Sequence, residues 1–300
     1  MYPRAFRYYR AKSLQEATAL LAELGTDAKV LAGGQSLIPL MKLRLSNPSN
    51  LVDLGFIPKL AYIEKESSRG NVLFGPMTRH AEIAASTVCR EIPILHDCAA
   101  GIADVQIRNM GTIGGSLAEA DPTGDWAPVL LTLSAKLRLV GPRGERWISL
   151  PAFITDAFTT VLASDELISE VSIPVPPVRS GGAYIALKRC AQVYASASVA
   201  VQLEMQDNST CKRAHIRLGA IGLTPTEVAE AETELRGKEV SNQNIGRAAE
   251  AASAIAQPQS DMRGSADYKR HVVGALTRQA LQVALRRSRG ESVEVSHQYA

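Results

Sequence analysis

The chain has 300 residues, enough for roughly two or three domains of ordinary size. It is 46% hydrophobic and 21% charged, the composition of a folded protein, and its formal net charge of +3 gives no indication of nucleic-acid binding. No apolar run approaches the roughly eighteen residues of a membrane span, and the N-terminal MYPRAFRYYR lacks the apolar core of a secretion signal.

The spacing of the cysteines and histidines matches none of the common metal-binding motifs. The four cysteines are far apart and form no C-x-x-C pair: Cys89, Cys98, Cys190 and Cys211. Zinc and iron–sulfur sites need clustered thiolates, and the five histidines show no H-E-x-x-H spacing either. We therefore expect no metal on this chain. Free thiols without an export signal favour the cytoplasm.

The first fifty residues predict a strand, a helix and then a β-α-β unit. After an opening strand, Ser13 is a good helix cap, and leucines recur at helical spacing until Gly25. A short strand over 29–32 leads to Gly33-Gly34, a second helical pattern and the strand LVDLG. This is the length of one crossover unit.

A second unit begins near Asn71. NVLFG predicts a strand, Thr78 a helix cap, and EIPILHDCAAGIAD a helix rich in small residues. The apolar run DWAPVLLTLSA is expected to be buried, and KLRLVG and RWISL flank the turn PRGE of a predicted hairpin.

The stretch IPVPPVRSGG, residues 173–182, predicts a linker because its prolines and glycines disfavour helix and central strand. Three strand-like runs follow, AYIALKR, SVAVQLEMQ and KRAHIRLGAIG, and then helical patterns near 225–235, 243–256 and 265–288. The tail domain is therefore predicted to be a small antiparallel sheet backed by helices, of α+β class. The last dozen residues are polar and expected to fray.

Two glycine pairs, AGGQS (32–36) and TIGGS (112–116), are candidate anion sites. Glycine lets the backbone turn sharply and approach a ligand, and unpaired N–H groups at a helix start attract phosphate. A single Gly-Gly pair is more often a plain turn, whereas two such pairs could hold the two phosphates of a dinucleotide. Neither is a G-x-G-x-x-G or G-x-x-x-x-G-K-[ST] motif, which argues against a Rossmann NAD site and a P-loop.

Three ordered segments carry a resemblance to a known family: AGGQSLIPLMKLRL (32–45), QIRNMGTIGGSLAEADPTGD (106–125) and YIALKRCAQVYASASVAV (184–201). Together with DMRGSADYKRHVVGAL, they resemble the FAD-binding medium subunit of molybdenum hydroxylases. These are the carbon monoxide dehydrogenase, quinoline oxidoreductase and nicotine dehydrogenase types, related to the flavin domain of xanthine dehydrogenase. The likeness covers essentially the whole chain.

The resemblance implies a fold and a domain organisation. It implies a two-subdomain FAD-binding domain of the vanillyl-alcohol-oxidase or PCMH-like type over 1–175, with subdomains of about 1–57 and 58–175. An α+β domain follows over 176–290, and then the tail 291–300.

The resemblance also implies a set of cofactor-binding residues, most of them in the two loops. These loop residues and their flanks are Leu31, Ala32, Gly33, Gly34, Gln35, Ser36, Leu37, Thr112, Ile113, Gly114, Gly115 and Ser116. Apolar pocket residues are implied at Ile102, Ala118, Leu167 and Ile168. Many members of the family have Asn where this chain has Ser116, so one amide contact differs.

Three polar or aromatic residues are given individual roles by the resemblance. Asp125 is implied to bind a hydroxyl of the adenosine ribose, and an N-cap of the following helix is an equal alternative. Lys188 is implied to lie near the flavin ring, where it would stabilise the reduced anion. Tyr194 could stack on the ring or be a core aromatic at a strand end.

The implied activity is electron transfer with no catalytic acid or base on this chain. A large partner subunit would carry the molybdenum cofactor, and a small partner would pass electrons from two [2Fe–2S] clusters through FAD to an external acceptor. A dimer of heterotrimers, a heterohexamer, is the implied assembly. A self-contained FAD-dependent oxidase and a nucleotide-sensing or scaffold subunit without a redox cofactor are the alternatives.

Overall fold

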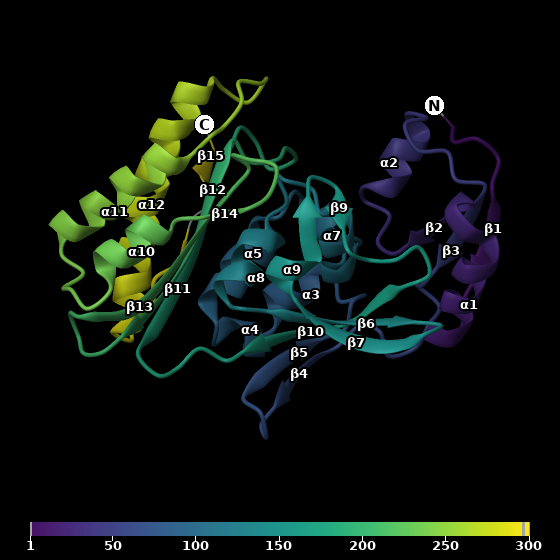
Figure 1. Cartoon of the computed structure of the whole chain (residues 1–300), viewed down its shortest axis with the longest axis horizontal. Coiled ribbons are helices and arrows are strands. Elements are labelled where there is room, and N and C mark those ends of the chain that lie inside the picture. Colours follow the sequence, from purple (N-terminus) through teal and green to yellow (C-terminus); the bar gives the residue numbers. More distant parts are fainter. Residues whose placement is uncertain (1, 296–297, 300) are drawn as a thin grey trace. The chain divides into compact units, whose positions relative to one another are not determined.

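The computed structural model describes residues 2–295 and 298–299. The chain forms two compact units that do not follow the order of the sequence. Unit 1 comprises Met1–Ile83, Val105–Ala120 and Ala135–Ile173, and unit 2 comprises Ala84–Asp104, Asp121–Ser134 and Pro174–Ala300. Two segments of the N-terminal half therefore pack with the C-terminal part, across the boundary predicted near residue 175 (Figure 1).

Unit 1 begins with a small parallel sheet in the order β1-β3-β2. Its strands are β1 (Arg7–Arg10), β2 (Ala28–Leu31) and β3 (Asn50–Asp53). The short helix α2 (Leu37–Lys42) connects β2 to β3, which pair in parallel register from Ala28↔Asn50 to Leu31↔Asp53. The β-α-β prediction is confirmed.

The helix α1 (Leu14–Leu24) has the termini that the sequence predicts. The Ser13 hydroxyl oxygen accepts the N–H of Glu16, and the chain leaves the helix at Gly25, which opens the turn η1 (Gly25–Asp27). The buried face of α1 joins a core with residues of β3, β6 and β10. That core fixes the N-terminal sheet on the rest of unit 1.

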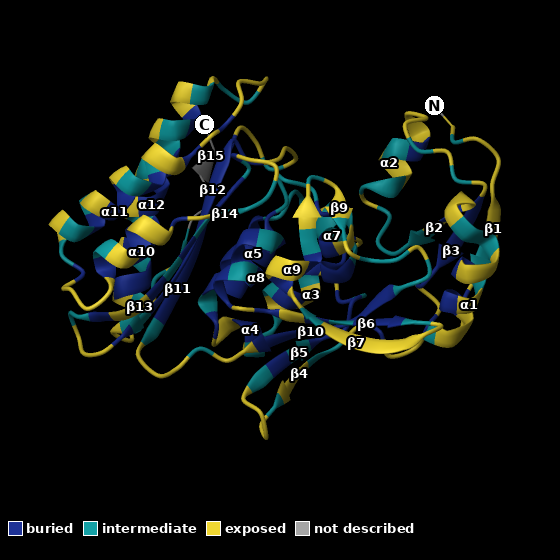
Figure 2. Ribbon diagram, viewed as in Figure 1, coloured by how far each residue is buried: buried dark blue, intermediate teal, exposed yellow. Residues whose placement is uncertain are grey.

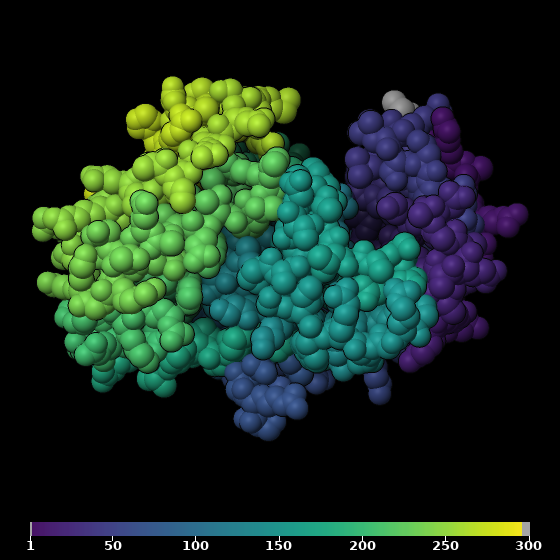
Figure 3. Space-filling model, in the orientation of Figure 1, coloured from purple at the N-terminus to yellow at the C-terminus, as the bar shows by residue number. Residues whose placement is uncertain are grey.

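The second sheet of unit 1 has five strands in the order β4-β5-β10-β6-β7. They are β4 (Ile63–Glu66), β5 (Asn71–Phe74), β6 (Lys136–Gly141), β7 (Gly144–Ser149) and β10 (Leu167–Pro174). The predicted hairpin is confirmed as β6–β7. The β4–β5 turn projects from the surface in Figure 3.

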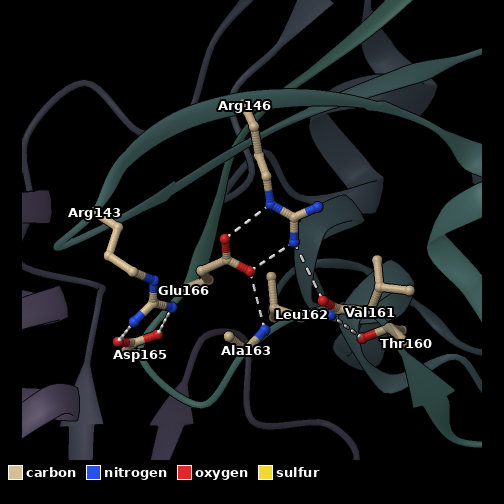
Figure 4. A network of polar contacts seen from close by, with 8 residues as sticks. All are labelled: Arg143, Arg146, Thr160, Val161, Leu162, Ala163, Asp165 and Glu166. Carbon is tan, nitrogen blue, oxygen red and sulfur yellow. Dashed lines mark hydrogen bonds and ion pairs between the residues drawn. The ribbon is translucent and has the colours of Figure 1, made fainter.

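Two arginines fasten the β6–β7 hairpin to the segment before β10 (Figure 4). Arg143 forms a bidentate pair with Asp165, and Arg146 a bidentate pair with Glu166. Glu166 also accepts the N–H of Ala163 at 3.0 Å. The edge strand β7 is thereby tied at one end to the chain that leads into β10. Near this segment lie α9 (Leu150–Phe153), β8 (Ile154–Asp156) and β9 (Thr159–Thr160).

Three short helices complete unit 1 or cross its border: α3 (His80–Ala85), α6 (Val105–Arg108) and α7 (Ile113–Glu119). Thr78 does not cap α3, contrary to the prediction. Its hydroxyl donates to the carbonyl oxygen of Tyr62 and accepts the N–H of the same residue. The Thr78 side chain is therefore bonded to the residue before β4 and not to the start of α3.

Unit 2 is built on a five-stranded sheet in the order β14-β13-β12-β11-β15. The strands are β11 (Ser180–Lys188), β12 (Ala197–Met205), β13 (Cys211–Gly219), β14 (Thr226–Glu227) and β15 (Gln298–Tyr299). The three long strands pair antiparallel, as predicted. One face carries α10 (Ala229–Leu235), α11 (Asn242–Ile255) and α12 (Ala266–Ser288), whose outer sides are exposed (Figure 2).

The other face of this sheet carries helices from the N-terminal half of the sequence. They are α5 (Pro93–Gly101), which packs on β11, and α8 (Trp126–Thr132), which packs on β12 and β13; α4 (Thr87–Arg90) precedes them. The sheet is therefore covered on both sides, which explains why β11 and β12 are buried along almost their whole length.

Two sequence expectations about unit 2 are wrong. Gly181 and Gly182, predicted as linker, belong to β11, and a side chain at Gly181 would overlap the carbonyl oxygen of Ala284 in α12. Glycine here marks close approach of a helix to the strand. The tail was expected to fray, but Gln298 and Tyr299 pair in parallel with β11; residues 296, 297 and 300 of that prediction lie outside the described residues. Among the described residues, no helix has the length and apolar character needed to cross a membrane.

Candidate functional site

The first glycine loop presents a row of backbone donors. In the described part of the chain, the peptide N–H groups from Gly33 to Leu37 have no hydrogen-bond acceptor, five in succession. The carbonyl oxygens of the loop are used instead, since Gly34 accepts from Ile38 and Ser36 from Leu40. Successive backbone N–H groups without an acceptor are suited to binding an anion.

A side-chain hydrogen bond and a glycine backbone conformation fix the shape of this loop. The amide Nε2 of Gln35 donates to the carbonyl oxygen of Gly33 at 2.9 Å, so the side chain braces the turn. Gly34 has φ +71°, a conformation that costs other residues free energy. The AGGQS segment is therefore a defined turn at the end of β2.

The second glycine segment is a helix start and not an open loop. Thr112 is the N-cap of α7, and its hydroxyl oxygen accepts the N–H of Gly115 at 3.1 Å. The N–H of Gly114 donates to Pro76, and the N–H of Ser116 to Thr112. The interpretation of TIGGS as a source of free backbone donors at both glycines is wrong, because capping and the contact with Pro76 use them.

The two segments lie against each other within unit 1, as their shared prediction requires. A side chain at Gly33 would overlap the carbonyl oxygen of Met110, two residues before the second segment. A Cβ on Gly115 would lie 3.5 Å from that of Ala32. The first segment thus supplies free donors, and the second forms the wall beside them.

In unit 2, two more of the predicted residues come together. The carboxylate of Asp125 lies 3.3 Å from the ammonium of Lys188, and both side chains are buried. Asp125 occupies the N-cap position of α8, but its side chain makes no capping hydrogen bond there. Lys188 also donates to the carbonyl oxygen of Gly101 at 2.8 Å. This bond uses one of the N–H groups that the resemblance would direct to the flavin ring.

The other predicted residues have mixed surroundings. Leu31 ends β2, Leu37 begins α2, and Ala118 is exposed on α7. Leu167 and Ile168 are buried in β10, and Leu167 packs in the core beneath α1. Ile102 follows α5, and Tyr194, in the β11–β12 connection, is 47% exposed, so it is not a core aromatic.

Sequence reasoning missed Tyr184, which is 1% exposed and donates its hydroxyl to Asp125 at 2.6 Å. Burial is the largest of the influences that raise its pKa well above the usual range, so the phenol keeps its proton. The signal was available in AYIALK, because residues four apart in a strand share a face, which places Tyr184 beside Lys188.

Clusters of metal-binding side chains do not occur among the residues that the structure describes. Three of the four cysteines are buried, and Cys190 is exposed. Burial raises the pKa of the Cys98 thiol well above its ordinary value. Cys98 is therefore a small apolar side chain of the core at neutral pH.

Family models account for nearly the whole chain. The family described as "FAD binding domain in molybdopterin dehydrogenase" matches residues 4–176, and "CO dehydrogenase flavoprotein C-terminal domain" matches residues 182–284. The intervening residues, 177–181, are the end of the β10–β11 connection and the start of β11.

Relatives of known name match over comparable lengths. The carbon monoxide dehydrogenase medium chain of Afipia carboxidovorans is 40% identical, over 96% of this chain and 100% of that one. The 6-hydroxypseudooxynicotine dehydrogenase complex subunit alpha of Paenarthrobacter nicotinovorans is 39% identical, over 99% and 100%.

Solved structures agree with these matches. A chain of carbon monoxide dehydrogenase from Hydrogenophaga pseudoflava superposes with a TM-score of 0.92 at 38% identity, over 96% of this chain and 99% of that chain. A chain of quinoline 2-oxidoreductase from Pseudomonas putida 86 gives a TM-score of 0.90 at 32% identity, over 96% and 99%.

Proposed function

The chain belongs to the family of FAD-binding medium subunits of molybdenum hydroxylases, and from this premise we propose that residues 33–37 bind the pyrophosphate of FAD. The observation that carries the proposal is the row of five peptide N–H groups without acceptors. A pyrophosphate is anionic and rich in acceptor oxygens, so it satisfies such a row.

The residues of unit 1 fit this cofactor in two further ways. The absence of a side chain at Gly33 lets the loop lie against Met110, and the Thr112 cap keeps α7 in place beside it. FAD, when bound, supplies a centre that exchanges electrons singly or in pairs. The contribution that we propose for the chain itself is to hold and orient the cofactor, with no catalytic acid or base assigned to it.

The function is that of an electron-transfer subunit of an oxidoreductase complex. Its relatives are named as medium chains or subunits of carbon monoxide and 6-hydroxypseudooxynicotine dehydrogenases. We propose partners of the same kind for this chain: a large subunit with the molybdenum cofactor and a small subunit with [2Fe–2S] clusters. A dimer of heterotrimers in the cytoplasm is the proposed assembly.

In unit 2, we propose Asp125 as a contact for a ribose hydroxyl of FAD and Tyr194 as a candidate for contact with the ring. Tyr194 is exposed enough to meet a ligand. Lys188 receives a different role, because its ammonium is buried and bonded to Gly101 and Asp125. It is proposed to stabilise the Asp125 carboxylate.

Purification of the complex from its source tests the function. Affinity capture of the full chain is expected to bring two further chains, with molybdenum and iron in the captured material and one flavin for each copy of this chain. Turnover of a substrate by the captured chain alone, without partners or metals, would instead identify a self-contained flavin oxidase.

A further inference from the structure

The strand β1 forms an open edge of the small sheet of unit 1 (Figure 1). Among the described strands its neighbour is β3 alone, and three of its four residues are exposed. Arg7 and Ala11 donate their peptide N–H groups to carbonyl oxygens in or next to β3. Because alternate peptide groups of a strand point to opposite sides, those of Tyr8 and Arg10 are directed away from β3. The outer side of β1 can therefore pair with one further strand.

Exposed aromatic side chains lie at the same edge. Phe6, Tyr8 and Phe56 are 40%, 43% and 50% exposed. The guanidinium carbon of Arg10 lies 4.6 Å from the ring centre of Phe56 and 5.6 Å from that of Tyr8. The Tyr8 hydroxyl is hydrogen-bonded to Asp53, which fixes its ring. Aromatic and arginine side chains that are already held in place are the types that contribute most to protein–protein interfaces.

The edge is also strongly basic. No Asp or Glu precedes Glu16 in the sequence. Four cations lie within the first twelve residues, and all are exposed: Arg4, Arg7, Arg10 and Lys12. This local charge of +4 exceeds the formal net charge of +3 of the whole chain. A surface of this kind is complementary to a segment that carries carboxylates.

Two other occupants fit the edge less well. A second copy of β1, paired antiparallel, would set Arg7 directly opposite Arg10, and like charges in such a pair are destabilising. A nucleic acid could contact the cations and the rings, but it has no peptide groups to pair with the outer side of the strand. The outward peptide groups of Tyr8 and Arg10 therefore favour an extended protein segment.

We propose that β1 is a docking site at which an acidic, extended segment of a partner chain is added as a fourth strand. The peptide groups of that segment pair with those of Tyr8 and Arg10, and its carboxylates face the exposed arginines. Its apolar side chains pack on the rings of Phe6 and Phe56. The inference rests on the proposed function in one respect, because the segment is assigned to a subunit of the proposed complex.

Site-specific cross-linking identifies the occupant. The full chain carries the photoreactive residue p-benzoylphenylalanine in place of Phe6, or in place of Phe158 as the control, which is 61% exposed between β8 and β9. The chain is captured from an extract of its source and irradiated, and the cross-linked peptides are sequenced. We expect position 6 to join to a partner-chain peptide that contains at least two Asp or Glu residues. Position 158 should not yield that peptide.

A pair of substitutions at Tyr8 separates strand addition from loss of the side chain. Tyr8→Pro and Tyr8→Ala both remove the phenol, but only proline removes the outward N–H group and blocks a fourth strand. At equal flavin content, Tyr8→Pro should recover about tenfold less partner chain than Tyr8→Ala. The double variant Arg4→Glu, Arg7→Glu should show a similar loss. Its control is Arg247→Glu, Arg278→Glu, which reverses two exposed cations of α11 and α12 and should show none.

Several results would overturn the proposal. From the cross-linking they are a product with a second copy of this chain, a peptide without acidic residues, no product in a complex that contains partner chains, or the same peptide from position 158. From the capture they are equal recovery with Tyr8→Pro and Tyr8→Ala, or full recovery with Arg4→Glu, Arg7→Glu. Loss of the partner chains after nuclease treatment would identify a nucleic acid at the edge and would also overturn it.

Folding and the proposed function are checked separately. If Tyr8→Pro retains no flavin, the double variant Arg4→Glu, Arg7→Glu decides, because both side chains are exposed. Capture of no further chain by the unaltered protein would refute the partners named under the proposed function, and this docking site with them. Capture of partners by the unaltered chain and by every variant would refute the docking site alone.

Discussion

The α-carbon of Gly33 lies against the carbonyl oxygen of Met110, so closely that no side chain fits between them. This contact holds the end of β2 beside the segment that leads into α7. It brings together two glycine segments that are eighty positions apart in the sequence. The free backbone donors of the first segment depend on it for their position.

Gly33→Ala is therefore expected to weaken FAD retention strongly. The added methyl group must push the loop away from Met110, with an overpacking cost of about 1–3 kcal/mol in unfolding free energy. Flavin absorbance after gel filtration and urea denaturation measure the two effects. Gly246→Ala, in α11 with its nearest atom 3.7 Å away, is the control and should keep full flavin content.

A second prediction separates loop geometry from backbone strain. Gly34 and Gly237 both have φ +71°, so alanine at either position should cost about 1 kcal/mol in backbone strain, and at Gly34 the methyl group must also displace the end of the Ile38 side chain. Only Gly34→Ala should lower FAD affinity, because only that turn carries the free donors. The measurement is a fluorescence titration of FAD with each variant. Equal FAD affinity in the two variants would contradict the assignment of residues 33–37.

Arg287 is predicted to be the main ionic support of unit 2. Its guanidinium makes a bidentate pair with Asp97 and also donates to the carbonyl oxygens of Gly182 and Val293. Burial raises the pKa of Asp97, and the pairing with Arg287 opposes that rise. Arg287→Met leaves a buried acid without its cation, which should cost about 3–5 kcal/mol.

Urea denaturation checks this cost, with Arg286→Met as the neighbouring control. Arg286 is 54% exposed and pairs with Glu291, so its loss should change stability by about 1 kcal/mol or less. If the two variants unfold at the same urea concentration, the ion pair with Asp97 does not support unit 2. Adding Asp97→Asn to Arg287→Met should recover part of the loss.

The β12–β13 turn should respond to acid through Asp207. Hydrogen bonds from the N–H groups of Ser209 and Thr210 lower its pKa from 3.8 to about 2. Because the folded-state pKa is the lower one, the ionised carboxylate stabilises the fold above pH 3.8, and this contribution is lost as the pH falls through about 2.

The stability difference between the unaltered chain and Asp207→Asn should accordingly narrow as the pH falls from about 4 towards 2. Urea denaturation across that range follows the difference, and NMR of the Asp207 carboxyl carbon gives the pKa directly. A stability difference that stays constant across the range would show that the carboxylate does not act through these two bonds.

Local sequence signals predicted much of the fold. Ser13 and Gly25 bound α1 as expected, and the hairpin around PRGE forms β6 and β7. These features depend on residues within a few positions of one another, where capping and turn chemistry act. The resemblance over three motifs then supplied the family and its cofactor.

What the sequence did not predict depends on contacts between distant segments. Thr78 looked like a cap, but its hydroxyl bonds to Tyr62. Gly182 looked like a linker, but it lies in a strand where Arg287 donates to its carbonyl oxygen. The link from Tyr184 to Asp125 spans 59 positions, so the pattern in AYIALK could place Tyr184 beside Lys188 but could not show its bond to Asp125.

The glycine segments show the same limit at the site. AGGQS and TIGGS have similar letters, yet one leaves its N–H groups free while the other uses those of both glycines in a helix start and a contact with Pro76. The difference comes from Thr112, whose hydroxyl caps α7, whereas Ser36 makes no side-chain capping bond. Both residues are favourable at an N-cap, so the sequence did not predict that Thr112 would cap its helix and Ser36 would not.

The most direct measurement of the central claim is the FAD content of the full-length chain after reconstitution, determined from its visible spectrum and the flavin released on denaturation. The account predicts a yellow protein with one FAD per chain, and a colourless but folded Gly34→Ala variant. A folded chain that takes up no FAD, or a Gly34→Ala variant with the full amount, would contradict it.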